Sequence, residues 1–397
     1  MMASRFWNRG KILLIGLTLL LAYLPQAAEA LPAWARKYGK KCTVCHVQFP
    51  KLKNFGIAFK NRGYRMEDEK GEYVWKSKNL PIGLVGSFDY TYSKANVAGT
   101  QTTRTGQVNT GTVELFAGGT LAPRISFFVD ALTADNRTLV QFDDILADSA
   151  LNIKVGDFNV DNYFLSRPRR LTATGYLVKT GPQAPGTADV TFANQGVELN
   201  GQFTDMGFRY ALGVGNDADA TTGTGIDNHR FGNMAYLILN QSFGLHTISL
   251  QYKRDRTTTN TGPHAGQNIL DDTHSVGASA EIRPFKKLII DAGVYYYDGG
   301  KAGDFTEGGS IKDLRVTSGT AEAIYSISKK WLGVARFDWN DTLDSNAFQE
   351  QYVVSLQYFP APNVKLNLEY TNLDISAGAG TATTENQSMI AAVTIGF

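Results

Sequence analysis

The residues with the most distinctive chemistry in this chain lie in the pentapeptide Cys42-Thr43-Val44-Cys45-His46. Two thiols spaced by two residues can bind a haem covalently, and the imidazole that follows can ligate its iron. The chain has only 2 Cys, and no other His occurs before His229, which argues against a zinc site. A redox disulfide would not require the adjacent histidine. The pentapeptide therefore predicts one covalently attached haem c, with Cys42 and Cys45 as attachment points and His46 as the proximal iron ligand.

The second axial ligand is left open by the sequence. Met66 is the only Met in residues 31–79, and a thioether ligand would raise the haem potential. In the alternative interpretation Met66 packs in a loop, and the iron is five-coordinate or takes its ligand from the rest of the chain.

The first thirty residues have the pattern of a secretory signal peptide. Three basic residues, Arg5, Arg9 and Lys11, precede the apolar run 12–21, and the small-residue sequence Ala28-Glu29-Ala30 follows. A single membrane anchor is the alternative, but the small-residue end disfavours it. We expect cleavage before Leu31 in the bacterial periplasm, where haem is attached to exported proteins.

Charge divides the remaining chain into two parts. Residues 31–79 contain 12 Lys/Arg and 4 Asp/Glu, whereas residues 80–397 contain 24 and 32. The excess of basic residues is either ordinary solvated surface or the means by which a small basic module sits against or inside a large acidic one. No basic-aromatic pattern or phosphate-binding loop is present, so no nucleic-acid partner is expected.

Residues 80–397 alternate between apolar and polar side chains with a period of two, which predicts β-strands with one apolar face. In residues 363–371, for example, Leu366 and Leu368 share one face and Lys365 and Glu369 the other. We predict sixteen strands, at 82–93, 108–121, 124–132, 149–160, 171–179, 190–203, 207–215, 231–241, 244–254, 272–282, 287–297, 313–326, 331–339, 349–359, 363–371 and 386–397.

The connections between these strands favour an outer-membrane barrel over a soluble sandwich. Short and long joints alternate, the strands tend to end in aromatic residues, and the strand number is even. Only the joint 161–170 breaks the alternation, as a longer joint on the short side. Both chain ends then lie on the periplasmic side. The predicted lumen side chains are Glu114, Lys154, Glu198, Arg209, Asp291, Lys365 and Glu369.

The predicted architecture is thus all-β, an antiparallel outer-membrane β-barrel of about 16 strands (80–397) preceded by a small, partly helical c-type haem module (31–79). Within the module, Pro50 and Gly63 suggest the first turn and the C-terminal cap of one helix. Leu52, Phe55 and Phe59 would form one apolar stripe on that helix, facing the porphyrin.

The module resembles the start of the fused monohaem cytochrome–porins of iron-oxidising bacteria, and the strand pattern that follows is similar to the same family. The residues that carry the resemblance are Ala35-Arg36-Lys37-Tyr38, Cys42-Thr43-Val44-Cys45-His46, Phe49-Pro50, Leu52, Phe55-Gly56, Phe59-Lys60 and Gly63-Tyr64. The resemblance implies oxidation of extracellular Fe(II) at the outer membrane, with electrons passed inward to periplasmic c-type cytochromes.

The residues lead independently to outer-sphere electron transfer, because a haem tethered before a barrel could plug the lumen and meet a donor at one mouth and an acceptor at the other. We expect outer-membrane lipid as surroundings and oxidoreductase-like Fe(II):cytochrome c chemistry. Three alternatives stay open: a transport porin with an accessory haem domain, an outward conduit to external acceptors, and a haem-based gas sensor. Loop carboxylates that would attract Fe(II) are Asp217, Asp219, Asp255, Asp271, Asp272, Asp298, Asp304 and Glu307.

Overall fold

The computed structural model describes residues 33–67, 69–77, 81–97, 102–111, 113–132, 137–160, 165, 169–180, 193–203, 206–217, 233–259, 269–299, 305–307, 310–312, 315–343, 347–377 and 383–396. The predicted signal peptide lies outside these ranges. Residues Pro32–Phe397 form one compact unit. Among the described residues, no helix is both long and apolar enough to cross a membrane.

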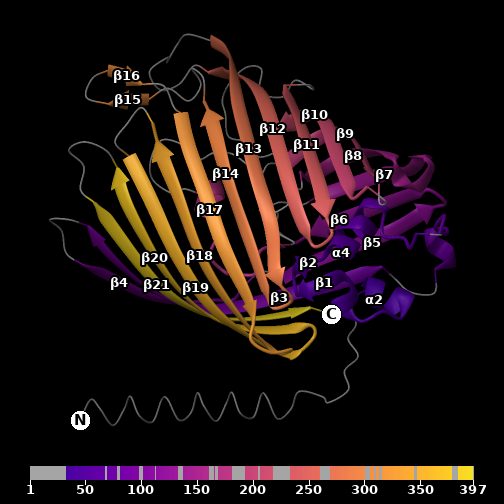
Figure 1. Cartoon of the computed structure of the whole chain (residues 1–397), viewed down its shortest axis with the longest axis horizontal. Coiled ribbons are helices and arrows are strands. Elements are labelled where there is room, and N and C mark those ends of the chain that lie inside the picture. The colour runs from indigo at the N-terminus through magenta and orange to yellow at the C-terminus, as the bar shows by residue number, and fades with distance from the viewer. Residues whose placement is uncertain are drawn as a thin grey trace. The chain divides into compact units, whose positions relative to one another are not determined.

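The wall of this unit is a closed antiparallel β-barrel (Figure 1). Its strands are β3 (Ile82–Val97), β4 (Thr103–Asn109), β5 (Val113–Ala122), β6 (Ile125–Ala131), β7 (Arg137–Leu146), β8 (Leu151–Asn159), β9 (Ala193–Phe203), β10 (Phe208–Asp217), β11 (Met234–Phe243), β12 (His246–Thr259), β13 (Ile269–Phe285), β14 (Leu288–Asp298), β17 (Arg315–Ser326), β18 (Trp331–Thr342), β19 (Ala347–Ala361), β20 (Val364–Ala377) and β21 (Thr384–Gly396).

Strands β4 and β5 lie end to end beside β3 and share one position in the wall, which therefore has sixteen positions. The last strand, β21, pairs with β3 and closes the wall. The predicted all-β barrel of about 16 strands is confirmed. A small separate hairpin, β15 (Phe305–Glu307) with β16 (Ser310–Lys312), lies in the connection between β14 and β17.

The two faces of the wall differ in polarity as the alternation predicts. In β20, Leu368 and Tyr370 are exposed, whereas Lys365 and Glu369, which lie in the opposite phase of the strand, are buried. Exposed apolar side chains on the outside and buried polar ones inside are the arrangement of a membrane barrel with a polar lumen. Among the predicted lumen side chains, those buried inside are Glu198, Arg209, Asp291, Lys365 and Glu369.

Two strand predictions are wrong, and they offset each other in the count. The segment 171–179 is not a strand; it is irregular and ends in the short helix α5 (Leu177–Thr180). The strand β7 is absent from the predicted set because Asp143 and Asp144 interrupt its apolar pattern. In the structure, Asp144 has a positive φ of 54° where the ladder with β8 shifts register. The short turn between β7 and β8 is 147–150, and the connection that contains 161–170 therefore lies on the long-loop side.

The N-terminal module contains three short helices, α2 (Ala33–Tyr38), α3 (Cys42–Cys45) and α4 (Asn54–Asn61), the strand pair β1 (His46–Gln48) and β2 (Lys51–Leu52), and the 3-10 turn η1 (Val74–Lys76). The helix predicted from Pro50 begins only at Asn54, because Pro50 lies in the turn between β1 and β2. Leu52 is therefore not on the helix. The predicted end is confirmed: Gly63, with φ +66°, follows the C-cap Arg62.

Candidate functional site

The two cysteines and the histidine are held together by the local fold. Cys42 and Cys45 bound the single turn α3, and neither is in a disulfide. His46 begins β1, and its Nδ1 lies 2.9 Å from the carbonyl oxygen of Pro50. If Nδ1 carries the proton, it donates to that carbonyl, and Nε2 keeps a free lone pair. Such a bond from the second ring nitrogen is the usual support of a metal-ligating histidine.

Burial affects the titration of all three groups. It lowers the pKa of His46, which favours the neutral imidazole that ligates iron. It raises the pKa of Cys42 and Cys45. Reactive CxxC pairs of disulfide oxidoreductases have lowered thiol pKa values. The raised pKa of both thiols is the opposite of that pattern, and two thiols beside one oriented imidazole are the donor set that a covalent haem requires.

A close backbone approach positions this motif on α4. A Cβ built on Gly56 would lie 2.5 Å from the carbonyl oxygen of Cys45, so the helix can approach the motif only because residue 56 is glycine. The backbone N–H of Lys53 donates to the same carbonyl at 2.8 Å. Of the apolar side chains near the thiols, Val44 is 36% exposed and Phe55 is 40% exposed, which leaves apolar surface for a porphyrin to cover. Phe59, from the predicted stripe, is buried instead.

Met66 lies in another sector of the barrel. Its neighbour Arg65 pairs with Asp144 of β7 at 2.9 Å. After His46 the chain contacts the turn between β17 and β18, where the Nε2 of Gln48 donates to the carbonyl of Lys329 at 3.0 Å. Around the wall, seven strand positions lie between β7 and this turn on one side and eight on the other. Met66 as distal ligand stays a prediction.

The module packs against the inner wall of the barrel. The amide of Gln141 on β7 donates to the carbonyl of Asn61 at 3.0 Å, and Trp34 Nε1 donates to the carbonyl of Gly118 on β5 at 2.9 Å. The ammonium of Lys51 forms an ion pair with Asp291 on β14 and lies 3.7 Å from Glu281 on β13. Lys51 is 0% exposed. The module thus reaches inward-facing side chains on several sides of the lumen.

A second segment, the described residues 165 and 169–180 between β8 and β9, also fills the lumen. Its backbone groups bond to wall side chains instead of to a strand, which is why the segment 171–179 does not form the predicted strand. The carbonyl of Leu171 accepts from Gln357 at 2.9 Å and from Lys365 at 3.1 Å. The backbone N–H groups of Ala173 and Thr174 donate to Glu369 at 2.8 and 2.7 Å. We call the described residues 165 and 169–180 the inserted loop.

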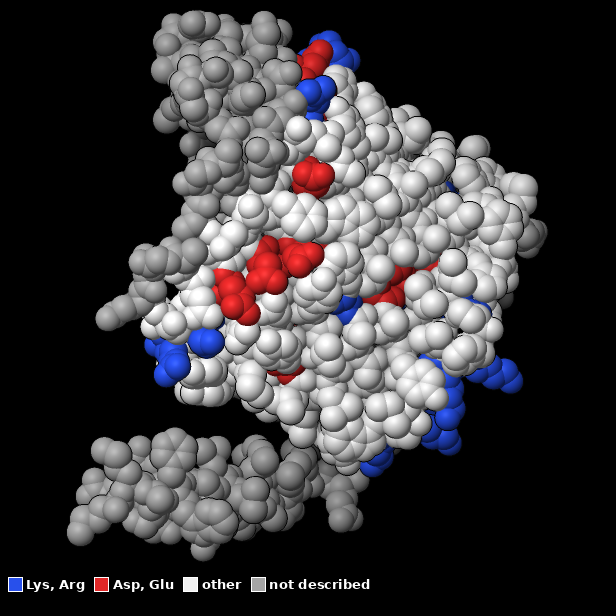
Figure 2. Space-filling model, turned by 60° about the vertical axis from the view of Figure 1, so that its left-hand side comes forward, with Lys and Arg blue, Asp and Glu red and all other residues white. Residues whose placement is uncertain are grey.

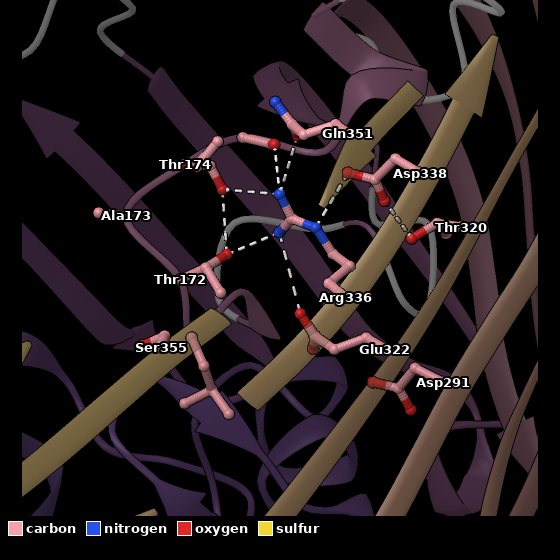
Figure 3. Close-up of polar contacts among 12 residues, drawn as sticks. Thr172, Ala173, Thr174, Asp291, Thr320, Glu322, Arg336, Asp338, Gln351 and Ser355 are labelled. Atoms are coloured by element: carbon pink, nitrogen blue, oxygen red, sulfur yellow. Dashed lines mark hydrogen bonds and ion pairs between the residues drawn. The ribbon is translucent and has the colours of Figure 1, made fainter. Parts of the chain in front are cut away.

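Arg336 on β18 makes the densest set of contacts with the inserted loop (Figure 3). Its guanidinium donates to the hydroxyl of Thr172 and to the carbonyl of Gly175, each at 2.6 Å, and to the carboxylate of Asp338 at 2.9 Å. Glu322 on β17 lies 3.8 Å from the same guanidinium. The Arg336 side chain is buried and has lost its contacts with water. These hydrogen bonds replace those contacts and hold the inserted loop in place.

The module and the inserted loop meet inside the barrel. Ile57 of α4 packs against a cluster formed by Leu165, Tyr176 and Val178 of the loop and Tyr295 of the wall. Val47 of β1 packs against a cluster that includes Leu171. The two segments therefore share apolar contacts as well as the polar wall.

The meeting point is crossed by a row of charged wall residues. Glu281, Asp291, Glu322 and Arg336 lie directly opposite one another on the consecutive strands β13, β14, β17 and β18. Three adjacent carboxylates repel one another unless cations are supplied. Lys51 from the module and Arg169 from the inserted loop both pair with members of this row, Arg169 with Glu281. We call these four wall residues the lumen charge row.

Asp291 was the only member of this network named from the sequence. Arg336 lies in the inward phase of its predicted strand, so the alternation could have found it. Lys51 and Arg169 lie outside strands, and no periodicity marks them. Of the loop carboxylates proposed to attract Fe(II), Asp255 is buried beside Lys253, and Asp272 pairs with Arg254 at 2.6 Å. The structure does not describe the side chains of Asp217, Asp219, Asp271, Asp304 and Glu307.

Comparisons with known proteins agree on the fold. No family model matches the chain, and no curated protein matches it. The outer membrane channel DcaP of Acinetobacter baumannii superposes with a TM-score of 0.58 at 11% identity, over 80% of this chain and 97% of that one. An anion-selective porin from Comamonas acidovorans gives 0.55 at 14%, over 80% and 99%, and OmpF of Salmonella typhi, in complex with daunomycin, gives 0.54 at 11%, over 84% and 100%. The chain has the porin fold of outer-membrane barrels.

Proposed function

We propose that this protein is an outer-membrane electron-transfer cytochrome–porin that holds one haem c through Cys42, Cys45 and His46. A bound haem c supplies reversible one-electron chemistry at its iron. One observation carries the proposal: a pair of free thiols and an imidazole with a carbonyl partner lie in a module that packs inside a membrane barrel. A porin with only a transport role has no need of this donor set in its lumen.

The remaining residues would position and insulate that centre. The carbonyl of Pro50 orients His46, Gly56 lets α4 approach the motif, and Lys51 holds the module on the wall. The lumen charge row and the inserted loop fill the space beyond it. This filling is the reason for proposing that charge crosses the membrane as electrons rather than as hydrated ions.

For the direction of transfer, the proposal is oxidation of extracellular Fe(II) to Fe(III), each ion giving one electron, with a soluble periplasmic c-type cytochrome as acceptor. It is supported by the resemblance of the module to the fused cytochrome–porins of iron-oxidising bacteria. Reversed flow to an external acceptor uses the same residues and is distinguished by the haem potential, since a high value favours Fe(II) oxidation.

The test is an anaerobic visible spectrum of the purified oxidised protein before and after addition of Fe(II). We expect c-type bands that sharpen rapidly on addition, and a Cys42→Ser/Cys45→Ser variant without covalently bound pigment. Pigment that dithionite reduces but Fe(II) does not would contradict the Fe(II) assignment. Absence of pigment from protein matured with a complete haem-attachment system would contradict the whole proposal.

A transport porin is the second candidate, and the likeness to porins and outer-membrane channels favours it. Conductance in planar bilayers separates the two. An open porin gives large, stable ion steps, whereas a lumen occupied by the module and the inserted loop gives little current.

A further inference from the structure

Lysines gather at the short-turn end of the barrel, on the side of the haem-binding motif. The turns that join β13 to β14 and β17 to β18 carry Lys286-Lys287 and Lys329-Lys330, and Lys40-Lys41 directly precedes Cys42. All six are exposed, and none forms an ion pair with a described residue. We call these six lysines the basic face.

The basic face adjoins the motif through the backbone. The carbonyl of Lys329 accepts from Gln48, two residues after His46. Lys51 reaches Asp291 on β14, the strand that begins just after Lys286-Lys287. The two basic turns therefore belong to the wall sector against which β1 and β2 pack.

Several exposed carboxylates among the described residues at this end of the barrel lie in another sector. Glu67, Glu69 and Asp148 are exposed near β5 to β8, the sector of Met66. The turn segments 283–287 and 327–330 contain no Asp or Glu. On the face seen in Figure 2, Lys and Arg side chains lie toward both the lower right and the lower left edges, and most of the visible Asp and Glu side chains lie higher on the wall. The two turns beside the motif thus carry four exposed lysines and no carboxylate of their own.

Exposed, unpaired lysines contribute little to folding, but a patch of one sign steers a partner of the opposite sign. Such steering raises association rates by about 10- to 1000-fold at low salt. Anionic lipid headgroups are also attracted to lysines at a membrane rim. Lys40-Lys41, however, lies between α2 and α3, in a module whose described residues bond to inward-facing groups of the barrel wall. A partner that engages both the module and the turns must cover the mouth of the lumen, as a soluble protein does.

We propose that the basic face is the docking surface for an acidic, soluble electron carrier in the periplasm. This inference rests on the proposed function and adds to it the location and the sign of the partner's contact surface. Docking there would place the carrier over the sector of Cys42, Cys45 and His46 rather than over that of Met66.

The experiment compares Lys329→Glu/Lys330→Glu with a matched control, Lys70→Glu/Arg124→Glu, which makes the same charge change at exposed positions in the other sector. Each haem-loaded protein is placed in nanodiscs of zwitterionic lipid, reduced, and mixed in a stopped-flow instrument with oxidised plastocyanin, an acidic copper protein. Basic cytochrome c serves as the probe of opposite charge.

At low ionic strength we expect the rate with plastocyanin to fall at least about tenfold in Lys329→Glu/Lys330→Glu and to change little in the control. The rate with basic cytochrome c should rise. The differences should vanish at about 1 M salt, where the Debye length is near 3 Å. Equal rates in the two variants at low salt would overturn the inference, as would an effect seen only in nanodiscs that contain anionic lipid.

Binding of each variant to immobilised plastocyanin is measured in parallel and needs no haem. If the visible spectrum shows no haem while binding still depends on Lys329 and Lys330, the proposed function fails and the docking surface stands. If haem is present and the rates of electron transfer to plastocyanin do not depend on Lys329 and Lys330, the docking surface is refuted and the proposed function stands.

Discussion

Replacement of Lys51 by methionine tests whether the N-terminal module is locked into the barrel by the lumen charge row. Methionine keeps an unbranched, largely apolar side chain of similar length and removes the ammonium. In the structure this ammonium pairs with Asp291 and lies 3.7 Å from Glu281, with no exposure to solvent. No hydrogen bond from a described residue reaches the other carboxylate oxygen of Asp291.

The expected cost follows from that environment. Removing one partner of a buried ion pair costs about 3–5 kcal/mol, because the remaining charge is left unpaired. Since each ~1.4 kcal/mol is tenfold in an equilibrium constant, the equilibrium between docked and undocked module should shift toward the undocked state by a factor of roughly 140 to 4000. Lys51→Met/Asp291→Asn removes both charges and should recover most of the loss.

Two assays report the change. Protease cleavage of the module in detergent-solubilised barrel measures undocking, and planar-bilayer conductance measures opening of the lumen. We expect faster cleavage and larger current in Lys51→Met, and near wild-type behaviour in the double variant and in the exposed control Lys40→Met. If Lys51→Met matches wild type in both assays, the lock does not exist. If the double variant is as open as the single one, the effect does not arise from the unpaired carboxylate.

Three further outcomes are expected. Arg336→Met should free the inserted loop, raise the conductance and lower the free energy of unfolding in denaturant by about 3–5 kcal/mol. The exposed control Arg256→Met should lower that free energy by less than about 1 kcal/mol. Equal losses in the two variants would contradict the role of Arg336. Gly56→Ala should lower haem incorporation, measured as the ratio of Soret to protein absorbance, because its Cβ would lie 2.5 Å from a backbone oxygen of the motif. Gly86→Ala, where nothing lies within 4 Å, is the control and should leave the ratio unchanged. His46→Ala should keep the covalent pigment but change its spectrum on loss of the proximal ligand; an unchanged spectrum would show that His46 does not ligate the iron.

Local signals were enough for much of the wall. A period of two is a property of the strand itself, so the polarity of Lys365, Leu368 and Glu369 could be predicted without knowing their neighbours. The alternation of short and long joints predicted the closed barrel for a similar reason, since turn composition is local. The thiol–imidazole motif is local too, because its spacing alone carries the chemistry.

Local signals failed where tertiary contacts override them. The segment 171–179 looks like a strand, but its backbone groups bond to wall side chains such as Gln357 and Glu369, which are far away in sequence. The sequence of β7 does not show the pattern of a strand because Asp143 and Asp144 interrupt its apolar positions. In the structure Asp143 is buried and Asp144 lies at a register shift, so both fit a strand that borders a polar lumen.

The sequence by itself determined the strand faces and the barrel class, and it contains the thiol–imidazole motif proposed to bind haem, since each depends on residues that are neighbours along the chain. Only the tertiary structure decided what fills the lumen. Lys51 and Arg169 are ordinary basic residues in the sequence and become charge partners only when closure of the barrel aligns Glu281, Asp291 and Glu322 on neighbouring strands. That alignment depends on the register between strands, which no single stretch of the chain encodes.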